Sequence, residues 1–309
     1  MATKLASVKL PARSFHQNNI EYIKLKNLIC IIFLTLLFNS CKEYPSGPAD
    51  HPSENNFSYP FEINSFWYYG TRNFTNNYRP DSLIAYFPTD TLEGVGGAIF
   101  LKDTVINNDT LRLLRNSHSV TGHSHATLEL YKQTGSGLMR MAFYSDGVNF
   151  GPFIPNPNSA RFKFGGKEFR SVKDIFNYYK NDLRDYMTGD TTLIFDDPPV
   201  VAIKYPIVQN TEWDFNIVGT TKMTKKYTTF ESVRLNDVSY NCIKIQKQWY
   251  MNGSSTPDPN LIFYDYFSKD GMIKRDFTIK DIAINNSFGQ LIGYLDAKEE
   301  SFLNFYTHP

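Results

Sequence analysis

Residues 59–69 read Tyr-Pro-Phe-Glu-Ile-Asn-Ser-Phe-Trp-Tyr-Tyr, and residues 205–215 read Tyr-Pro-Ile-Val-Gln-Asn-Thr-Glu-Trp-Asp-Phe. The two stretches align without a gap. Tyr, Pro, Asn and Trp are identical, Ser matches Thr, and the final Tyr matches Phe. Two of the three Trp residues in the chain lie here, which argues against coincidence. The sequence therefore predicts two diverged copies of one unit, over about residues 59–145 and 205–282.

The residues that follow each shared Asn predict β-strands. Trp67 and Tyr69 recur at period two, as do Trp213 and Phe215, so each pair points to one face of a strand. Over residues 243–249, apolar Ile and Trp side chains alternate with Lys and Gln, which is typical of a sheet with one buried face. The aromatic content of 16% agrees, because aromatic side chains suit pleated surfaces. Each unit is therefore expected to be an antiparallel meander.

Turn residues occur at matching places in the two units. Asn-Asp pairs at residues 108–109 and 236–237 separate apolar runs and predict tight turns. Gly137 and Gly271 stand where a hairpin needs positive φ. The second unit is expected to be followed by one or two final strands over residues 289–306.

The segment between the units has a helical pattern. Ser171 and Asp174 have the spacing of a capping box, with Asp in place of the usual Glu. Apolar residues then recur at helical spacing up to Met187: Ile175, Phe176, Tyr179, Leu183, Tyr186 and Met187. This pattern predicts a helix over about residues 171–187. The Asp-Asp-Pro-Pro sequence at residues 196–199 is expected to break the chain before the next strand.

These patterns together predict a mainly β fold. We expect two related antiparallel β-meander units, arranged as a sandwich or half-barrel, with one intervening helix. The first β-unit would span residues 58–150 and the connecting segment residues 151–204. The second β-unit and the C-terminal strands would span residues 205–309.

The N-terminal part has the outline of a secretory signal. A basic stretch at residues 24–27 precedes an apolar run at residues 28–38. That run would span about 17 Å as a helix, against about 30 Å for the hydrocarbon core of a bilayer. Residues 1–40 are therefore predicted to be a signal peptide rather than a permanent membrane helix.

A cysteine, Cys41, directly follows the predicted signal peptide. The sequence Phe38-Asn39-Ser40-Cys41 resembles the lipobox of bacterial lipoproteins, although that family prefers Leu three residues before the Cys and Ala or Ser two before it. The resemblance implies cleavage before Cys41 and acylation of its thiol, for example by palmitate. Residues 41–57 would then form a lipidated, Pro-rich tether. Lipoproteins that stay at the inner membrane carry Asp at the next position, so Lys42 implies an outer-membrane destination, either periplasmic or surface-exposed.

The stretch at 59–69 adds a second resemblance. A Tyr-Pro…Asn-Ser-x-Trp-x-Tyr opening after a lipobox and a short tether is similar to uncharacterised β-rich lipoproteins of Bacteroidota-type bacteria. Those proteins often have Gly at the position of Asn64 or Asn210. The resemblance implies a β-rich envelope protein and no known activity.

Charge and cysteine content narrow the possible partners. The chain has 309 residues, with 32 Lys and Arg against 31 Asp and Glu, so it lacks the basic footprint of a nucleic-acid-binding protein. Removing residues 1–40 takes away five basic residues and one acidic residue, which changes the net charge from +1 to −3.

Cys30 would leave with the signal peptide and Cys41 would carry lipid, so Cys242 would have no partner for an intramolecular disulfide. We interpret Cys242 as a small strand residue rather than a nucleophile.

Candidate catalytic and metal sites are sparse. His118, His123 and His125 lie close in sequence, and the last two would share one face of a strand, a usable spacing for metal ligands. The same stretch can also be a polar hairpin, because it contains no carboxylate. Carboxylates at residues 196–197, or at 185 and 190, could bind Ca²⁺ or act as an acid–base pair, but turn composition favours a structural role. No Gly-x-Ser-x-Gly elbow occurs.

The sequence therefore favours a non-catalytic binding or assembly module, lipid-anchored in the cell envelope, with no catalytic residue and no cofactor assigned. An envelope hydrolase or metal-binding protein using His118, His123 and His125 is the alternative. Expected partners are the membrane, through the lipid on Cys41, and an envelope protein, a glycan or a hydrophobic ligand. Tyr68, Tyr178 and Tyr250 could stack on sugars, and a hydrophobic ligand would need curved sheets that enclose a cavity.

Overall fold

The computed structural model describes residues 57–87, 92–120, 123–144, 160–183 and 192–309. The predicted signal peptide, Cys41 and nearly all of the tether lie outside the described residues, so these predictions stay open. For residues 118–120 and 123–125 the backbone is described and the side chains are not. None of the helices in the described part is long and apolar enough to cross a membrane.

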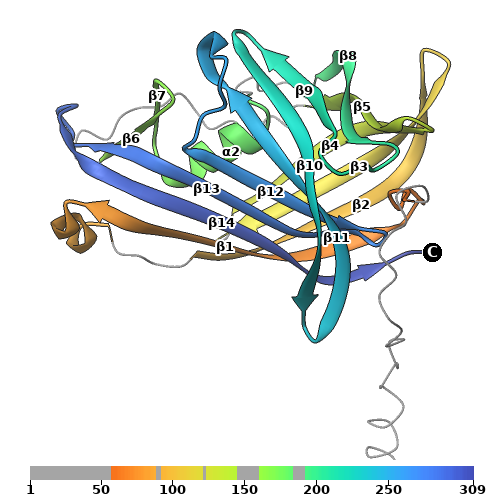
Figure 1. Ribbon diagram of the computed structural model, residues 1–309, viewed down its shortest axis with the longest axis horizontal. Helices are drawn as coiled ribbons and strands as arrows, with labels where there is room; N and C mark the ends of the chain where they lie inside the picture. Colours follow the sequence, from red (N-terminus) through yellow and green to blue (C-terminus); the bar gives the residue numbers. More distant parts are fainter. Residues whose placement is uncertain (1–56, 88–91, 121–122, 145–159, 184–191) are drawn as a thin grey trace, which may run out of the picture. The chain divides into compact units, whose positions relative to one another are not determined.

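The described strands form one antiparallel sheet that curves into a nearly closed barrel (Figure 1). Its order is β8-β5-β4-β3-β2-β1-β14-β13-β12-β11-β10-β9, while β6 pairs with β13 and β7. The first strands are β1 (Phe66–Arg79), β2 (Leu92–Ile106), β3 (Asp109–Val120), β4 (His123–Thr134), β5 (Gly137–Tyr144), β6 (Arg161–Phe164) and β7 (Lys167–Phe169). The later ones are β8 (Leu193–Lys204), β9 (Glu212–Val218), β10 (Thr221–Leu235), β11 (Val238–Tyr250), β12 (Leu261–Ser268), β13 (Gly271–Asn285) and β14 (Leu291–Thr307). The predicted fold class, mainly β and half-barrel-like with one helix, is confirmed.

The two Trp stretches build the same local turn. Asn64 and Asn210 both have positive φ, 70° and 67°, which Asn tolerates better than most residues. The amide of Asn64 donates to the carbonyl of Phe100 at 2.7 Å, and the amide of Asn210 donates to the carbonyl of Tyr227 at 2.8 Å. Descent of residues 59–145 and 205–282 from one duplicated unit remains a prediction.

The indole nitrogen of each of these two Trp residues donates a hydrogen bond to a backbone carbonyl. Trp67 Nε1 donates to the carbonyl of Asp270 at 2.6 Å, at the turn between β12 and β13. Gly271 makes this approach possible, because a Cβ there would lie 2.3 Å from the indole nitrogen of Trp67. Trp213 Nε1 donates to the carbonyl of Val201 on β8 at 2.9 Å. The first Trp therefore contacts the other half of the barrel, and the second contacts the neighbouring edge strand.

The hairpin turns agree with the sequence except for one shift. Gly137 and Gly271 have φ of 152° and 105°, as predicted. Residues 236 and 237 form the β10–β11 turn with φ of 47° and 65°. The β2–β3 turn is formed by residues 107 and 108 rather than 108 and 109, because Asp109 already pairs with Ile106 in the ladder.

The helix α2 (Val172–Lys180) is shorter than predicted. Its start is as expected, since the Ser171 hydroxyl accepts a hydrogen bond from the Asp174 amide at 3.1 Å. It ends at Lys180, and the next described residues leave the helical conformation, because Asp182 and Leu183 adopt positive φ of 58° and 63°. Residues 184–191 lie outside the described part of the chain.

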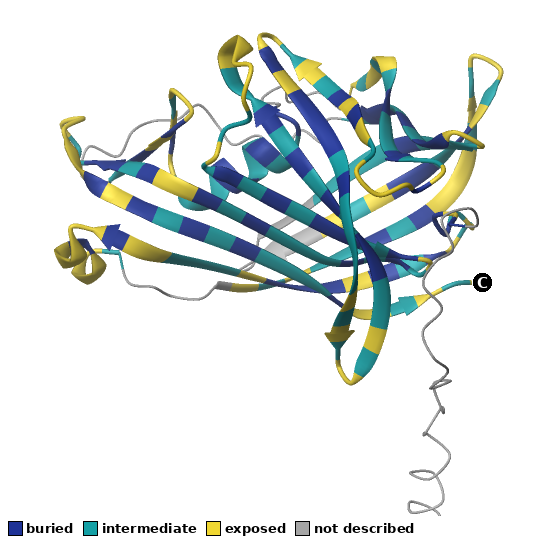
Figure 2. Cartoon of the chain, in the orientation of Figure 1, coloured by how far each residue is buried: buried dark blue, intermediate teal, exposed yellow. Residues whose placement is uncertain are grey.

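Two apolar clusters fill the barrel interior, and Figure 2 shows the alternation of buried and exposed residues that creates them. The helix cluster packs α2 against the sheet and contains Phe176, Trp249 and Phe277. The Trp67 cluster surrounds Trp67 and contains Phe100 and Ile273. Strands β1 and β8 to β14 contribute buried residues to both clusters, so the clusters form successive layers of one barrel. The helix cluster also contains residues of α2, β6 and β7, and the Trp67 cluster residues of β2, β3 and β5.

The sheet ends at a seam between β8 and β9, its two edge strands. Within the described strands, side chains rather than a backbone ladder close this β8–β9 seam. Lys225 Nζ donates to the carbonyl of Ala202 at 3.0 Å. The Tyr227 hydroxyl donates to the carbonyl of Lys204 and accepts from its amide. The strand β8 also runs through residues 196–199, where the sequence predicted a break. At these residues the pairing of β8 with β5 shifts register, opposite residues 140–142 of β5.

Candidate ligand-binding cavity

A belt of charged side chains crosses the barrel between the two apolar clusters. On β13, Arg275 lies between Ile273 of the Trp67 cluster and Phe277 of the helix cluster. On β11, Lys247 lies in the same way between Ile245 and Trp249. Alternation along a strand places all of these residues on the inner face. The charged belt consists of Arg140 (β5), Lys225 (β10), Lys247 (β11), Asp265 (β12), Arg275 (β13) and Glu299 (β14).

The helix α2 adds a polar face to this belt. Its apolar side chains, Phe176 among them, pack into the helix cluster. Its other face turns Lys173, Asn177 and Lys180 towards the barrel interior. Lys180 Nζ lies 2.8 Å from the carboxylate of Glu299. One helix therefore closes the apolar layer and supplies charge to the belt.

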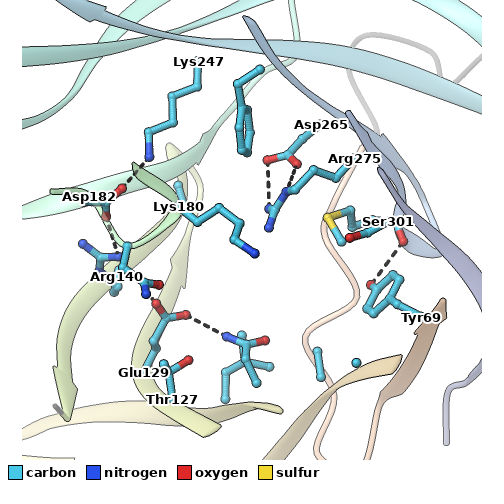
Figure 3. A pocket seen from close by; sticks show the side chains of 18 of the residues that line it. Tyr69, Thr127, Glu129, Arg140, Lys180, Asp182, Lys247, Asp265, Arg275 and Ser301 are labelled. Carbon is cyan, nitrogen blue, oxygen red and sulfur yellow. Dashed lines mark hydrogen bonds and ion pairs between the residues drawn. The ribbon is translucent and has the colours of Figure 1, made fainter. Parts of the chain in front are cut away.

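The belt borders a cavity of about 700 Å³ inside the barrel (Figure 3). This volume falls within the usual range for sites that bind small organic molecules. One wall is apolar and aromatic and comes mainly from the Trp67 cluster: Tyr59, Tyr69, Phe100, Leu138, Ile203, Phe267 and Met272. The opposite side consists of the charged belt and the polar face of α2. The cavity is therefore amphipathic.

Asp182 organises one side of the belt. Its carboxylate accepts a hydrogen bond from Lys247 at 2.5 Å and another from Arg140 at 3.0 Å. Arg140 also donates to Asp196 at 2.8 Å. Figure 3 shows the chain of contacts that runs from Lys247 through Asp182 to Arg140. The turn that ends α2 early is what brings the Asp182 carboxylate to these two cations.

A second ion pair lies on the neighbouring strands. Arg275 donates to both carboxylate oxygens of Asp265, at 2.6 and 3.2 Å. Burial alone would lower the pKa of the Arg275 guanidinium, but Asp265, Glu299 and Tyr69 together outweigh burial and raise it. The pKa of Arg140 is raised in the same way, because Asp182, Glu129, Asp196 and Tyr131 together outweigh burial. Both guanidiniums are therefore firmly charged and held by protein carboxylates.

Lys225 differs from the other cations of the belt. Among the described residues, no carboxylate lies within salt-bridge distance of its ammonium group. Its contacts are the carbonyl of Ala202 and the ring of Phe215, whose centroid lies 4.1 Å from Nζ. Burial lowers the pKa of Lys225 to about 8. Lys225 is thus a buried cation on the cavity wall with an incomplete set of partners.

The cavity also contains neutral hydroxyl groups. Burial raises the pKa of Tyr59, Tyr69 and Tyr131, so these phenols keep their protons. Tyr131 donates to the carboxylate of Glu129 at 3.0 Å, and Tyr69 donates to the carbonyl of Met272 at 3.2 Å. The tyrosines therefore supply flat apolar surface and hydrogen bonds rather than charge.

The histidine residues proposed as a metal site lie on the β3–β4 hairpin. The backbones of His118 and His125 are register partners, and His123 pairs with Val120. Their side chains lie outside the described residues, so the metal-binding alternative stays a prediction. Within the part of the chain whose side chains are described, no group of three His, Cys, Asp or Glu residues is placed to hold a metal ion.

The carboxylate, cysteine and tyrosine candidates from the sequence have structural contacts in the barrel. Asp196 pairs with Arg140, in agreement with a structural role, whereas residues 185 and 190 lie outside the described part. Cys242 is buried, and burial raises the pKa of its thiol to about 12, so it is poorly suited to act as a nucleophile. Tyr178 packs against Phe169 and Tyr179 rather than standing free for a sugar.

The charged belt itself was missed by the sequence analysis. The signal was present, since Lys247 falls in phase with Ile243, Ile245 and Trp249 on the buried face of β11. Lys225 likewise falls between the buried Met223 and Tyr227 on β10. Charged residues in the buried phase of several strands would have indicated a polar layer inside the barrel.

The scan against protein-family models finds no match, and the search of curated proteins finds none either. Two solved structures are similar to this chain. One is a protein of Bacteroides fragilis inferred to be exported, with a YmcC-like fold; it is 9% identical, with 82% of this chain and 99% of that chain covered and a TM-score of 0.31. The other is a protein of Parabacteroides distasonis inferred to be a lipoprotein; it is 10% identical, with 82% and 100% covered and a TM-score of 0.31. At this level of similarity, neither structure indicates what this chain binds.

Proposed function

We propose that this protein is a lipid-anchored protein of the cell envelope whose barrel binds a small amphipathic molecule without transforming it. The observation that carries the proposal is the interior cavity of about 700 Å³, with an aromatic wall on one side and the charged belt on the other. Such a lining suits a molecule that has both an apolar body and a polar group.

The energetics of the barrel support a binding role. Buried ion pairs are expensive, because desolvation of the charges offsets much of their attraction, and apolar side chains of similar size often give a more stable core. The belt interrupts two well-packed apolar clusters with six charged residues. A role in ligand recognition accounts for charges that packing alone would disfavour.

The envelope part of the proposal rests on residues 28–41. Changing Cys41 to Ala should release the protein from the membrane fraction, because the acylated thiol is the proposed anchor. Changing Cys242 to Ala is the matched control, since it removes a cysteine that carries no lipid. Membrane fractionation of both variants measures the effect, and a Cys41→Ala protein that stays in the membrane would contradict the anchor. Contacts with a glycan or another envelope protein remain further proposals.

Filling the cavity should abolish binding of the small molecule. Ser301 lines the cavity on β14, so Ser301→Phe places a ring in the space proposed for the ligand. Thr307→Phe, at an exposed position of the same strand, is the control. Native mass spectrometry of the protein purified from envelopes should show one co-purifying small molecule on the wild type and the control, and none on Ser301→Phe. Equal occupancy of all three proteins would contradict the proposal.

A further inference from the structure

We infer that the ligand carries a carboxylate on an apolar body, and that Lys225 binds this carboxylate inside the barrel. The inference rests on the proposed binding function and names the chemistry of its ligand. It is carried by the unequal pairing of the cations in the belt, by the position of Lys225 on the seam, and by the apolar wall beside it.

The ammonium group of Lys225 has N–H bonds without a hydrogen-bond acceptor among the described residues. An ammonium group has three N–H bonds, and the described partners of Lys225 are one carbonyl, on Ala202, and the face of one ring, on Phe215. Its residue is only 8% exposed, so its contact with bulk water is small. A buried charge without an opposite charge is costly. An anionic group of a ligand would complete the coordination of this ammonium.

The neighbouring strand strengthens the case. Lys247 is the direct register partner of Lys225 on β11, and like charges at such positions destabilise a sheet. Lys247 is held by Asp182. Among the described residues, no carboxylate is paired with Lys225 in the way that Asp182 is paired with Lys247. The carboxylate of a ligand would fill this place.

The other cations of the belt leave little room for a second anion. Arg275 is paired with Asp265, and Lys180 of α2 with Glu299. Arg140 lies within salt-bridge distance of Glu129, Asp182 and Asp196, and Asp182 also holds Lys247. Lys173, on the polar face of α2, also lines the cavity and has no carboxylate within salt-bridge distance among the described residues, but it is only partly buried. Lys225 is therefore the buried cation of the cavity that lacks a carboxylate partner.

The apolar wall determines how the rest of the ligand lies. Tyr59, Phe100, Phe267 and Met272 line the cavity and belong to the Trp67 cluster or pack against it. The next inward residue after Lys225 along β10 is Tyr227, which belongs to the same cluster. A ligand held at Lys225 would extend its apolar body along this wall. A linear alkyl acid and an aromatic acid share this chemistry, and affinity measurements can separate them.

Isothermal titration calorimetry on the full chain carrying Cys41→Ala, which removes the lipid, tests the inference. The probes are dodecanoate, its uncharged analogue dodecan-1-ol, and naphthalene-2-carboxylate. Lys225→Met keeps the length of the side chain and removes its charge. We expect it to weaken dodecanoate binding at least tenfold, as for the loss of a charged hydrogen bond, and to leave the affinity for dodecan-1-ol unchanged. Lys222→Met, at an exposed position of the same strand, should change neither affinity.

The pH profile gives a readout that a merely structural role would not change. The groups that act on Lys225 are Lys247, Asp265, Arg275 and Asp182, and burial sets its pKa at about 8. Dodecanoate binding needs the ammonium form, so affinity should be full below pH 8 and fall as the pH rises above it. Lys225→Arg stays charged, so its binding should not fall over this range.

The outcomes separate the two proposals. If Lys225→Met leaves dodecanoate affinity within twofold of the wild type while both alkyl probes bind, the inference is wrong and the cavity still binds ligands. If none of the three probes binds the wild type, both the inference and the proposed function fail. Tighter binding of dodecanoate than of naphthalene-2-carboxylate would support a linear acid, and the reverse order an aromatic one.

Discussion

The barrel closes in two different ways on its two sides. Between β1 and β14, twelve residues of β1 pair with partners on the neighbouring strand. Between β8 and β9, the described residues form no such ladder, and the side chains of Trp213, Lys225 and Tyr227 reach the carbonyls of β8 instead. Both β1 and β9 begin with the same Asn turn, so the difference arises after that turn.

The difference explains where a cation could be left with spare donors. In a closed ladder, strand carbonyls are satisfied by the neighbouring backbone. At the seam, the carbonyls of β8 accept from inward-facing side chains, and this brings the Lys225 ammonium to the cavity wall. The continuous β1–β14 ladder contributes to stability, and the β8–β9 seam positions Lys225, the proposed ligand-binding group.

Removing the two Trp side chains should show the largest contrast. Trp67 is fully buried among Tyr59, Phe100 and His308, so Trp67→Ala should lower the free energy of unfolding by about 3–5 kcal/mol. Trp213→Ala at the seam should cost less, because Trp213 is 6% exposed and its strand is an edge. Urea unfolding measures both values. A larger loss for Trp213 would reverse the comparison.

Changing Lys225 to Met should stabilise the protein while it weakens binding. In the fold the pKa of Lys225 is about 8, against 10.5 for an ordinary lysine, so the buried charge costs roughly 3 kcal/mol at pH 7. The unfolded chain keeps its proton to higher pH, so wild-type stability should rise between about pH 8 and 10.5. Lys225→Met should be more stable at pH 7 and lack this rise. Lys222→Met should behave like the wild type in unfolding experiments across this range, and a less stable Lys225→Met would speak against a penalised charge.

Removing one hydroxyl at the seam should give the smallest effect. Tyr227→Phe loses both hydrogen bonds to the backbone of Lys204, at a cost of about 1–2 kcal/mol. Amide hydrogen exchange should become faster along β8 and remain unchanged in β14. Tyr69→Phe is the control, because its hydroxyl bonds to Met272, away from the seam. Uniformly faster exchange in both strands would show that the seam does not open separately.

The sequence revealed the strands and their turns, because alternation and Asn or Gly at positive φ are local properties. It did not reveal the belt, because the side of a strand that faces the cavity depends on how distant strands pair. Lys247 carried a local signal, since it breaks the apolar phase of β11. Asp182 carried none: the apolar spacing predicted a longer helix, and the ion pairs with Lys247 and Arg140 accompany a turn that ends it early.

A crystal structure of the Cys41→Ala chain with dodecanoate would show whether the barrel holds an anionic amphiphile at Lys225. We expect the carboxylate within hydrogen-bond distance of Lys225 Nζ and the alkyl chain along Tyr59 and Phe100. A carboxylate bound at another cation, a reversed chain, or dodecanoate found outside the barrel would contradict it.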